Sequence, residues 1–308
     1  MDILTFREIL TGISGVPITA YGADGEVDIG VTRAIYARVA KAGIHNIVAA
    51  GNTGEFYALT PAEITVVTEA AVAGVDGKAP VTAAVGRSLR EAIAMARTAK
   101  TIGASAVMSH QPVDPFAAPA AQIDYFRNLA DASFLPMVAY VRADGFSLDD
   151  LLRLAAHPNI AGIKFATTDI LLLSRVVAAS AAGNALFICG LAESWAPAFT
   201  AAGARGFTSG LVNVAPQISL AIHAALEAGD YQEARRMIDI IEPFERMRTQ
   251  YRNGANVTVV KEAVEIELGV SVGEVRVPGL PRLAPQDRVK LTETLGQWPS
   301  LMSRASGY

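Results

Sequence analysis

Lys164 lies within the apolar stretch IAGIKFATTD (residues 160–169), which has the composition of a strand buried on both faces. It is the only one of the six lysines that lies in such a segment. Burial lowers the pKa of a lysine from about 10.4 toward neutrality, and a shift of about three units costs on the order of 4 kcal/mol. The neutral amine can attack a carbonyl carbon and form a Schiff base. We therefore interpret Lys164 as a candidate nucleophile; the alternative is a lysine that extends to the surface or pairs with a carboxylate.

Two other segments carry groups that such an amine would need. Tyr140 lies near the end of the apolar run PMVAYV (residues 136–141), and its phenol could shuttle protons if a partner lowered its pKa of about 10. The alternative is a core tyrosine with a satisfied hydroxyl. In the turn GNTGE (residues 51–55), two glycines allow the consecutive N–H groups of Gly51, Asn52 and Thr53 to bind a carboxylate. The Thr53 hydroxyl could relay a proton to Tyr140, whereas the alternative is an ordinary glycine-bearing turn.

Eight short apolar runs recur along the chain, and a longer helix-like stretch follows each of them. Near-continuous apolarity, in place of alternation, is typical of strands buried on both faces. Eight strand–helix alternations with short loops predict an α/β fold whose parallel sheet closes into a (β/α)8 TIM barrel. An open doubly wound sheet is the alternative, but PITAYGADGEVD lacks the glycine-rich phosphate turn that such sheets usually carry. The runs are residues 15–19, 46–50, 80–85, 105–109, 136–141, 160–166, 185–190 and 206–210.

Helix boundary signals support this alternation. Three capping boxes mark helix starts, and glycines just before the following strands mark helix ends. The boxes are Thr60 with Glu63, Ser88 with Glu91 and, more weakly, Ser147 with Asp150. After about residue 230 the strand runs stop, and three helix-like segments follow. The sequence therefore predicts a barrel catalytic domain over residues 1–230 and a C-terminal helical appendage over residues 231–308.

In a barrel of this kind, reactive groups collect at the carboxyl ends of the strands and in the loops that follow. Arg142 is the natural bidentate partner for a carboxylate at the far end of a substrate, and Ser209 and Asn213 are further candidates for contacts there. The four histidines lie in different units, and none is spaced from a carboxylate as metal sites prefer, so we predict no metal site. The same rule also selects His110, Gln111 and Glu193.

Composition limits the class of protein. The chain has 308 residues, of which 51% are hydrophobic and 18% charged, so it is expected to fold. The net charge is −4 with both signs interspersed, which gives no basic footprint for nucleic acid and no polybasic membrane segment. No apolar run approaches the roughly 18 residues of a membrane span, and MDILTFREIL does not resemble a signal peptide. The single Cys189 excludes an intramolecular disulfide, and we expect a soluble cytoplasmic protein.

Three of these features occur together in a known family. The turn GNTGEFYALTPAEI, a tyrosine in the fifth run and GIK in the sixth resemble the dihydrodipicolinate synthase / N-acetylneuraminate lyase family of class I, Schiff-base-forming barrels. The resemblance implies Lys164 as the Schiff-base lysine, Tyr140 as the proton shuttle, and Asn52 and Thr53 with their amides as the cradle for a pyruvyl carboxylate. It further implies pyruvate or another 2-keto acid as the small-molecule partner. No cofactor is implied beyond the covalent Lys164 adduct, and the expected assembly is a homo-oligomer, either tetramer or dimer.

Departures from the synthases within this family point to a subgroup. Asn52 replaces the first threonine of the turn, Val113 stands where synthases usually carry a tyrosine, and Arg142 follows Tyr140 by only two residues. The sequence is more similar to the 5-dehydro-4-deoxyglucarate dehydratases, which share the turn, the Tyr-x-Arg of the fifth run and Gly-Leu after the seventh. Their lysine is typically followed by Asp-Gly, where this chain has Phe-Ala. Contacts with the far end of the substrate are therefore not carried over from the resemblance.

The leading hypothesis is a lyase that dehydrates a 2-keto-3-deoxy sugar acid, with decarboxylation if the substrate is a dehydrodeoxyglucarate. One alternative is a pyruvate-dependent aldolase or a dihydrodipicolinate synthase-type condensation, which would release or consume pyruvate. A second alternative is a barrel that binds keto acids without turnover. The complete set of Lys164, Tyr140 and Thr53 argues against this second alternative.

Overall fold

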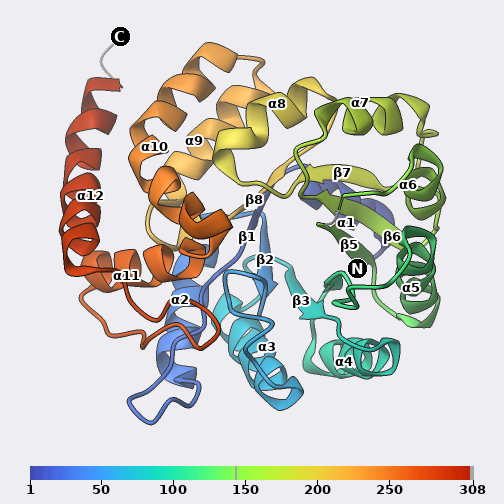
Figure 1. Cartoon of the computed structure of the whole chain (residues 1–308), viewed down its shortest axis with the longest axis horizontal. Helices are drawn as coiled ribbons and strands as arrows, with labels where there is room; N and C mark the ends of the chain where they lie inside the picture. Colours follow the sequence, from blue (N-terminus) through green and yellow to red (C-terminus); the bar gives the residue numbers. More distant parts are fainter. Residues whose placement is uncertain (143, 306–308) are drawn as a thin grey trace.

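A closed barrel of parallel strands forms the centre of the molecule (Figure 1). The computed structural model describes residues 1–142 and 144–305, and over these residues the chain forms eight strands. Each strand pairs with the next along the chain, and the eighth pairs with the first. The predicted (β/α)8 barrel is therefore confirmed. The strands are β1 (Ile13–Gly15), β2 (Asn46–Ala49), β3 (Val81–Val85), β4 (Ala106–Ser109), β5 (Met137–Val141), β6 (Ile160–Phe165), β7 (Leu186–Cys189) and β8 (Phe207–Ser209).

Helices surround the barrel and alternate with its strands (Figure 1). All three predicted capping boxes are present, at the starts of α3 (Pro61–Val75), α4 (Leu89–Ile102) and α6 (Leu148–Ala155), so the local sequence determines where these helices begin. Two short 3-10 helices, η1 (Glu193–Trp195) and η2 (Leu211–Asn213), lie in the loops after β7 and β8. The outer helices are α2 (Ile29–Lys41), α3 (Pro61–Val75), α4 (Leu89–Ile102), α5 (Pro119–Ala132), α6 (Leu148–Ala155), α7 (Ile170–Ala179), α8 (Ala196–Ala201) and α9 (Pro216–Glu227).

The first strand is the one that the sequence pattern misplaced. We expected it at residues 15–19, but β1 ends at Gly15. Pro17 has no N–H to continue a ladder, and the Ile18 N–H donates to the side chain of Asn213 (3.0 Å) instead of to a strand. The chain therefore leaves the sheet after Gly15, although Ile18 stays fully buried.

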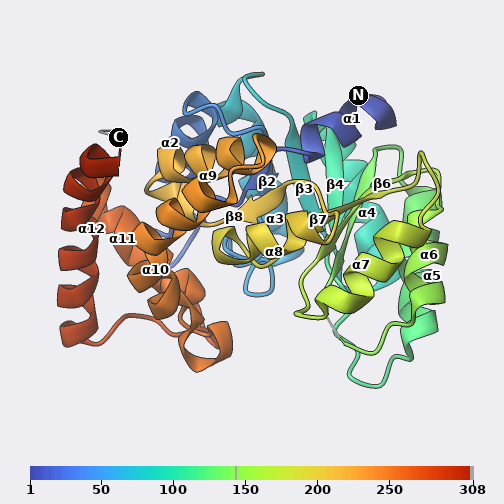
Figure 2. The same ribbon diagram turned by 90° about the horizontal axis from the view of Figure 1, so that it is seen from above.

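A helix before the barrel, α1 (Ile3–Leu10), lies at one end of the strands (Figure 2). Phe6 and Leu10 are buried among the side chains of the barrel interior. A Cβ at Gly162 would lie 2.9 Å from Leu10 Cδ1, so the glycine near the start of β6 leaves room for this side chain. Because α1 packs against the start of β6, it fills the amino end of the barrel. The carboxyl end, where active sites of such barrels form, is left for other elements.

The predicted helical appendage consists of α10 (Tyr231–Asn253), α11 (Asn256–Leu268) and α12 (Pro285–Ala305), which lie together on one side of the barrel (Figures 1 and 2). The Asp230 carboxylate caps α10 by accepting the N–H of Glu233 (2.9 Å). Buried side chains of these helices, such as Phe244 and Leu291, belong to the same hydrophobic cluster as the outer layer of the barrel. The appendage therefore packs directly on the barrel.

A buried ion pair connects the appendage to the turn at residues 51–55. Lys261 Nζ donates to Glu55 Oε1 (2.9 Å), and Glu55 Oε2 accepts the backbone N–H of Arg276 (2.9 Å). The Lys261 and Glu55 side chains are only 1% and 3% exposed, and Lys261 Nζ also lies 4.1 Å from the centre of the Tyr21 ring. Because each buried charge needs the other, this pair holds the turn against α11. The sequence analysis assigned no role to Glu55 or Lys261.

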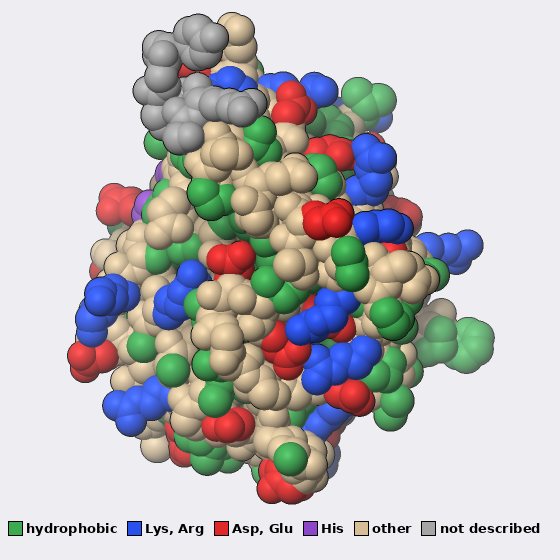
Figure 3. Space-filling model, turned by 90° about the vertical axis from the view of Figure 1, so that its left-hand side faces the viewer, with side chains coloured by type: hydrophobic (Ala, Val, Ile, Leu, Met, Phe, Trp, Pro, Cys, Tyr) green, Lys and Arg blue, Asp and Glu red, His purple; other side chains and the backbone are tan. Residues whose placement is uncertain are grey.

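Charged side chains of both signs are interspersed over the face shown in Figure 3, with hydrophobic side chains between them. This mixture agrees with the small net charge of −4. Within the described ranges, no helix combines the length and the apolar composition that a membrane crossing requires.

Candidate active site

A cavity of about 620 Å³ opens at the carboxyl ends of the strands, and α10 contributes to its wall. This volume is typical of a small-molecule site. Of the residues that the sequence predicted, Asn52, Thr53, Tyr140, Arg142, Lys164 and Ser209 all line this one cavity. The barrel thus brings together side chains that are as far as 157 positions apart in the sequence, from Asn52 to Ser209.

Lys164 extends into the barrel and is 4% exposed. It is the register partner of Tyr140 on the neighbouring strand, so both side chains lie on the inner face. Lys164 Nζ lies 3.9 Å from the centre of the Tyr140 ring, and no carboxylate of the described residues forms a salt bridge with it. Burial, with a smaller effect of the Arg142 charge, lowers the pKa of Lys164 from 10.5 to about 7. Much of the amine is therefore neutral at pH 7, as attack on a carbonyl requires.

Tyr140 is buried beside Lys164 and is protonated at rest, because burial raises the pKa of Tyr140 to about 12. The nearby Arg142 charge opposes this rise in the phenol pKa. Thr53 is 5% exposed and lines the same cavity, but in the described part of the chain no hydrogen bond joins its hydroxyl to Tyr140. The relay expected between Thr53 and Tyr140 is therefore not formed as a direct hydrogen bond. The phenol is a proton donor until a positive charge develops next to it.

The turn after β2 offers unused N–H groups to the cavity. Its backbone is closed by the Glu55 N–H on the Asn52 carbonyl (3.1 Å) and the Phe56 N–H on the Gly51 carbonyl (3.3 Å). The N–H groups of Asn52 and Thr53 donate to no other backbone or side-chain group among the described residues. Two consecutive free donors on the wall of the cavity suit a carboxylate.

Two of the expected substrate contacts do not line the cavity. Gly51 lies behind the turn, where a Cβ would come within 2.6 Å of Val16 Cγ1, so its role is close packing. Asn213 is fully buried, and its amide accepts the N–H of Ile18 (3.0 Å) and donates to the carbonyls of Val16 (3.0 Å) and Gly210 (2.8 Å). Its amide therefore joins the end of β1 to the loop after β8, instead of facing a substrate.

Arg142 lies at the rim of the cavity and is exposed. Its backbone N–H donates to Gln111 Oε1 (2.7 Å), which fixes the chain where β5 ends. Its positive charge is felt by both Lys164 and Tyr140, since it lowers the pKa of each. An exposed guanidinium at this place can meet a substrate anion, but solvent competes for it.

Ser209 faces the cavity, and its hydroxyl proton is already used in a hydrogen bond. Its Oγ donates to Glu193 Oε1 (2.5 Å), and Ser219 Oγ donates to the same oxygen (2.6 Å). Glu193 is fully buried, and its Oε2 has no hydrogen-bond partner among the described residues. Burial, together with the charge of Glu245, raises the pKa of Glu193 above its usual range. The Ser209 oxygen also accepts the backbone N–H of Val212 (3.2 Å), so one lone pair is left that can accept a hydrogen bond from a substrate hydroxyl.

His110 forms an aromatic wall behind Tyr140. It is fully buried and stacks on Phe56, with ring centres 3.9 Å apart and an angle of 3° between the rings. It meets the Tyr140 ring edge-on at 5.4 Å, and neither of its ring nitrogens has a partner in the described part of the chain. Burial lowers the pKa of His110 well below 6.5, so the imidazole is neutral.

The appendage supplies cavity residues that the sequence analysis missed. Glu245, Arg248 and Asn253 of α10 line the cavity. The end of α10 is kinked, because Tyr251 and Arg252 adopt left-handed backbone angles (φ 53° and 56°). Consecutive left-handed residues other than glycine are strained, and such strain tends to occur at ligand sites. The one sequence signal was the alternation of Glu and Arg in the segment EPFERMR.

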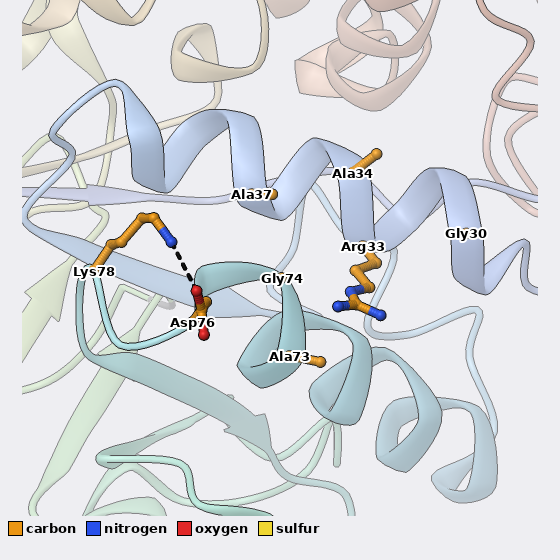
Figure 4. Close-up of a pocket in the computed structure, with 8 residues that line it drawn as sticks. All are labelled: Gly30, Arg33, Ala34, Ala37, Ala73, Gly74, Asp76 and Lys78. Atoms are coloured by element: carbon orange, nitrogen blue, oxygen red, sulfur yellow. Dashed lines mark hydrogen bonds and ion pairs between the residues drawn. The ribbon is translucent and has the colours of Figure 1, made fainter.

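A second, more open hollow of about 390 Å³ lies between α2 and α3 (Figure 4). It forms where the helices approach closely, since a Cβ at Gly74 would lie 2.5 Å from the Arg33 carbonyl oxygen. The charged side chains at its edge include the exposed ion pair of Lys78 with Asp76 (3.0 Å). Nothing in this hollow matches the arrangement around Lys164.

Comparison with known proteins identifies the family of this chain. A model of the dihydrodipicolinate synthetase family matches residues 9–297. The chain belongs to this family. The resemblance inferred from the turn, the tyrosine and the lysine is thereby confirmed.

Relatives within the dihydrodipicolinate synthetase family cover nearly the whole chain. A probable 5-dehydro-4-deoxyglucarate dehydratase of Streptomyces coelicolor is 32% identical over 299 residues, 94% of each chain. One from Streptomyces avermitilis is 35% identical over 269 residues, 85% of each chain. The crystal structure of a dihydrodipicolinate synthase from Oceanobacillus iheyensis superposes with a TM-score of 0.92 at 39% identity, covering 97% of this chain and 100% of that one. The protein is a lyase of this family.

Proposed function

We propose that this lyase dehydrates a 2-keto-3-deoxy sugar acid through a Schiff base on Lys164, and that a 5-dehydro-4-deoxyglucarate is its substrate. The observation that carries the proposal is the buried Lys164 amine, with its pKa near 7, 3.9 Å from the Tyr140 ring inside the cavity. The relatives named as dehydratases of this sugar acid support the choice of substrate. No cofactor is needed, because the imine itself supplies the electron sink.

The first step joins the enzyme to the substrate. The neutral Lys164 amine adds to the C2 ketone, and loss of one water gives a protonated imine. The C1 carboxylate binds the free N–H groups of Asn52 and Thr53. Tyr140, protonated at rest, donates the proton that the departing C2 oxygen needs.

The second step removes a proton from C3. The imine places a positive charge next to the Tyr140 ring, which lowers the pKa of the phenol from its resting value. The phenolate accepts the C3 proton, with the Thr53 hydroxyl lining the same cavity. The electron pair of the broken C3–H bond forms a C2–C3 double bond, and the C2–N π pair moves onto the nitrogen, which gives a neutral enamine. This phenolate is the one left when Tyr140 gave up its proton in the first step, so imine formation is the event that switches Tyr140 from acid to base.

The third step breaks the bond from C4 to its hydroxyl. Electrons return from the enamine, the hydroxyl leaves, and Tyr140 returns the proton so that water departs. With a dehydrodeoxyglucarate, loss of C6 as carbon dioxide follows, since the conjugated imine accepts that electron pair. The resulting dienamine takes up a proton from water at C3, which restores the imine, and the C5 enol becomes an aldehyde. Hydrolysis of the imine then releases a semialdehyde acid and restores Lys164. Arg142 and Ser209 line the same cavity and hold the C4 and C5 hydroxyl groups of the substrate, Arg142 as a hydrogen-bond donor and Ser209 as an acceptor.

Product analysis tests this proposal. The protein is incubated with a panel of 2-keto-3-deoxy sugar acids, and pyruvate, carbon dioxide and semialdehyde acid are measured. We expect the semialdehyde acid without pyruvate, and no product from a Lys164→Met variant. Release of pyruvate and an aldehyde would instead identify an aldolase. Keto-acid binding with no product from any member of the panel would identify a binding protein.

We also propose that the protein forms a homo-oligomer. After β4, Phe116 is 94% exposed and Val113 is 69% exposed, close to each other in the chain. Apolar side chains exposed to this degree are often covered by another subunit. Light scattering should give a mass above one chain of 32.3 kDa, and a mass of one chain at micromolar concentration would contradict the proposal.

A further inference from the structure

Arg248 of α10 is a buried cation on the wall of the cavity. It is 6% exposed, although arginine side chains are almost never this buried without partners. Its Nη1 donates to Glu245 Oε1 (2.5 Å), and its Nε donates to Asn256 Oδ1 (2.9 Å). These two contacts fix the plane of the guanidinium. They leave Nη2 without a hydrogen-bond partner among the described residues.

The free Nη2 reaches into the cavity over Gly210. A Cβ on Gly210 would lie only 2.7 Å from Nη2 and 3.4 Å from Thr53 Oγ1. The absence of a side chain at the end of β8 is thus what admits the guanidinium, and it places the group on the same wall as Thr53. Two donors on one nitrogen, held at a fixed angle in a partly dehydrated cavity, are a site for an anionic oxygen.

Neighbouring arginines are less suited to this task. Arg246 lines the cavity too, but its side chain is 75% exposed and is paired with Glu242. Arg142 is exposed at the rim. Both arginines of α10 are paired with a glutamate, but a donor shielded from water interacts more strongly with an anion than an exposed one does. The buried Nη2 of Arg248 is therefore the better anion-binding group of the two.

The place of Arg248 in the fold indicates which part of the substrate it meets. Lys164 lies within strand β6, whereas α10 belongs to the appendage that covers the carboxyl end of the barrel. A substrate whose C2 is bound to Lys164 and whose C1 carboxylate lies at the turn after β2 must extend its remaining carbons toward the mouth. Its far end therefore approaches α10.

We propose that Arg248, oriented by Glu245 and Asn256, binds the second, distal carboxylate of the substrate and so selects six-carbon dicarboxylic 2-keto acids. This inference rests on the proposed function for the position of C2 at Lys164, and it adds the residue that determines specificity. It also gives the appendage a role in recognition: the strained kink after Thr249 leads the chain to Asn256, which holds Arg248.

Two keto acids that form the imine with Lys164 but cannot be dehydrated test this inference without turnover. 2-Oxoadipate and 2-oxohexanoate have the same length, differ in the terminal carboxylate, and carry no hydroxyl to eliminate. Each is incubated with the protein and borohydride, and the concentration that gives half-maximal labelling of Lys164 is measured by mass spectrometry, with pyruvate as the third probe. The wild-type protein should be labelled at lower concentration by 2-oxoadipate than by 2-oxohexanoate.

Three variants test whether Arg248 causes the preference for 2-oxoadipate. Arg248→Met, combined with Glu245→Gln to keep the charge balanced, should raise the half-maximal concentration of 2-oxoadipate about 10- to 100-fold, the size of a charge-assisted hydrogen bond. Gly210→Ala should produce a similar rise, because it displaces Nη2 while both charges remain. Arg246→Met, the matched control on the same helix, should keep the preference. Labelling by pyruvate should stay within about threefold of wild type in all three, which also reports an intact site.

Two results would overturn the inference. One is a wild-type protein that is labelled equally well by 2-oxoadipate and 2-oxohexanoate, or an Arg248→Met/Glu245→Gln variant that keeps the wild-type preference for 2-oxoadipate. The other is an equal loss of pyruvate labelling, which would assign Arg248 to the carboxylate next to the ketone. If the sugar-acid panel yields no dehydration but the preference for 2-oxoadipate depends on Arg248, the proposed reaction fails and this inference stands.

Discussion

Replacement of Lys164 by methionine should stabilise the protein near neutral pH, and the gain should shrink as the pH rises. Burial lowers the pKa of Lys164 from 10.5 to about 7 in the folded chain. Between these two values the unfolded chain binds a proton that the folded chain does not, so stability of the wild type rises with pH across this window. The full shift corresponds to about 5 kcal/mol well below pH 7 and to about 4 kcal/mol at pH 7, and the part lost between pH 7 and pH 9 is about 2 kcal/mol. Methionine has a similar shape and no charge, so the variant lacks this dependence.

Urea unfolding at several pH values and one protein concentration measures the effect. The free energy of unfolding of the variant minus that of the wild type should fall by about 2 kcal/mol from pH 7 to pH 9. Lys41→Met provides the control, because Lys41 is exposed and its difference curve should be flat. Parallel curves for wild type and Lys164→Met would show that the amine is not dehydrated in the folded protein, and the account of its reactivity would fail.

Three further predictions concern the site and its support. The rate of Lys164 labelling by pyruvate and borohydride should increase with pH and be half-maximal near pH 7, where the amine loses its proton; a rate that is constant from pH 6 to pH 9 would contradict this. Tyr140→Phe should lower turnover about 10²- to 10⁴-fold while Lys164 is still labelled, and turnover close to wild type would remove the phenol from the mechanism. Lys261→Met should destabilise the protein by about 3–5 kcal/mol, because Glu55 is left buried without its partner, and adding Glu55→Gln should restore part of the loss. An unchanged midpoint of urea unfolding for the single variant would refute that role of the ion pair.

The strands and helices of the barrel were predictable because their signals are local. Near-continuous apolar runs mark strands buried on both faces, and each capping box sets a helix start within its own four residues. The misplaced β1 shows the limit of such local signals. Pro17 breaks the ladder, but the partner that takes the Ile18 N–H is Asn213, 195 positions away. A hydrogen bond of that range leaves no mark in the local pattern.

The same distinction between local signals and long-range contacts holds at the site. Lys164, Tyr140 and the turn at residues 51–55 were found because the barrel fixes which strand ends meet. Arg248 and Lys261 were not found, since they lie on helices whose place over or beside the barrel follows from tertiary packing alone. A lysine such as Lys261, in the amphipathic sequence VVKEAVEIE, looks exposed until Glu55 is known to lie beneath it. The amide of Asn213 was assigned to the substrate because its position after β8 is right, while its contacts with the backbone depend on the path of β1.

The measurement that tests the account most directly is peptide mapping after treatment with pyruvate and borohydride. The account predicts one reduced pyruvyl adduct per chain, on the peptide that contains Lys164, with greater yield at pH 8 than at pH 6. An adduct on any other lysine, or no adduct when the protein still turns over its keto acid, would contradict the claim that this amine performs the chemistry.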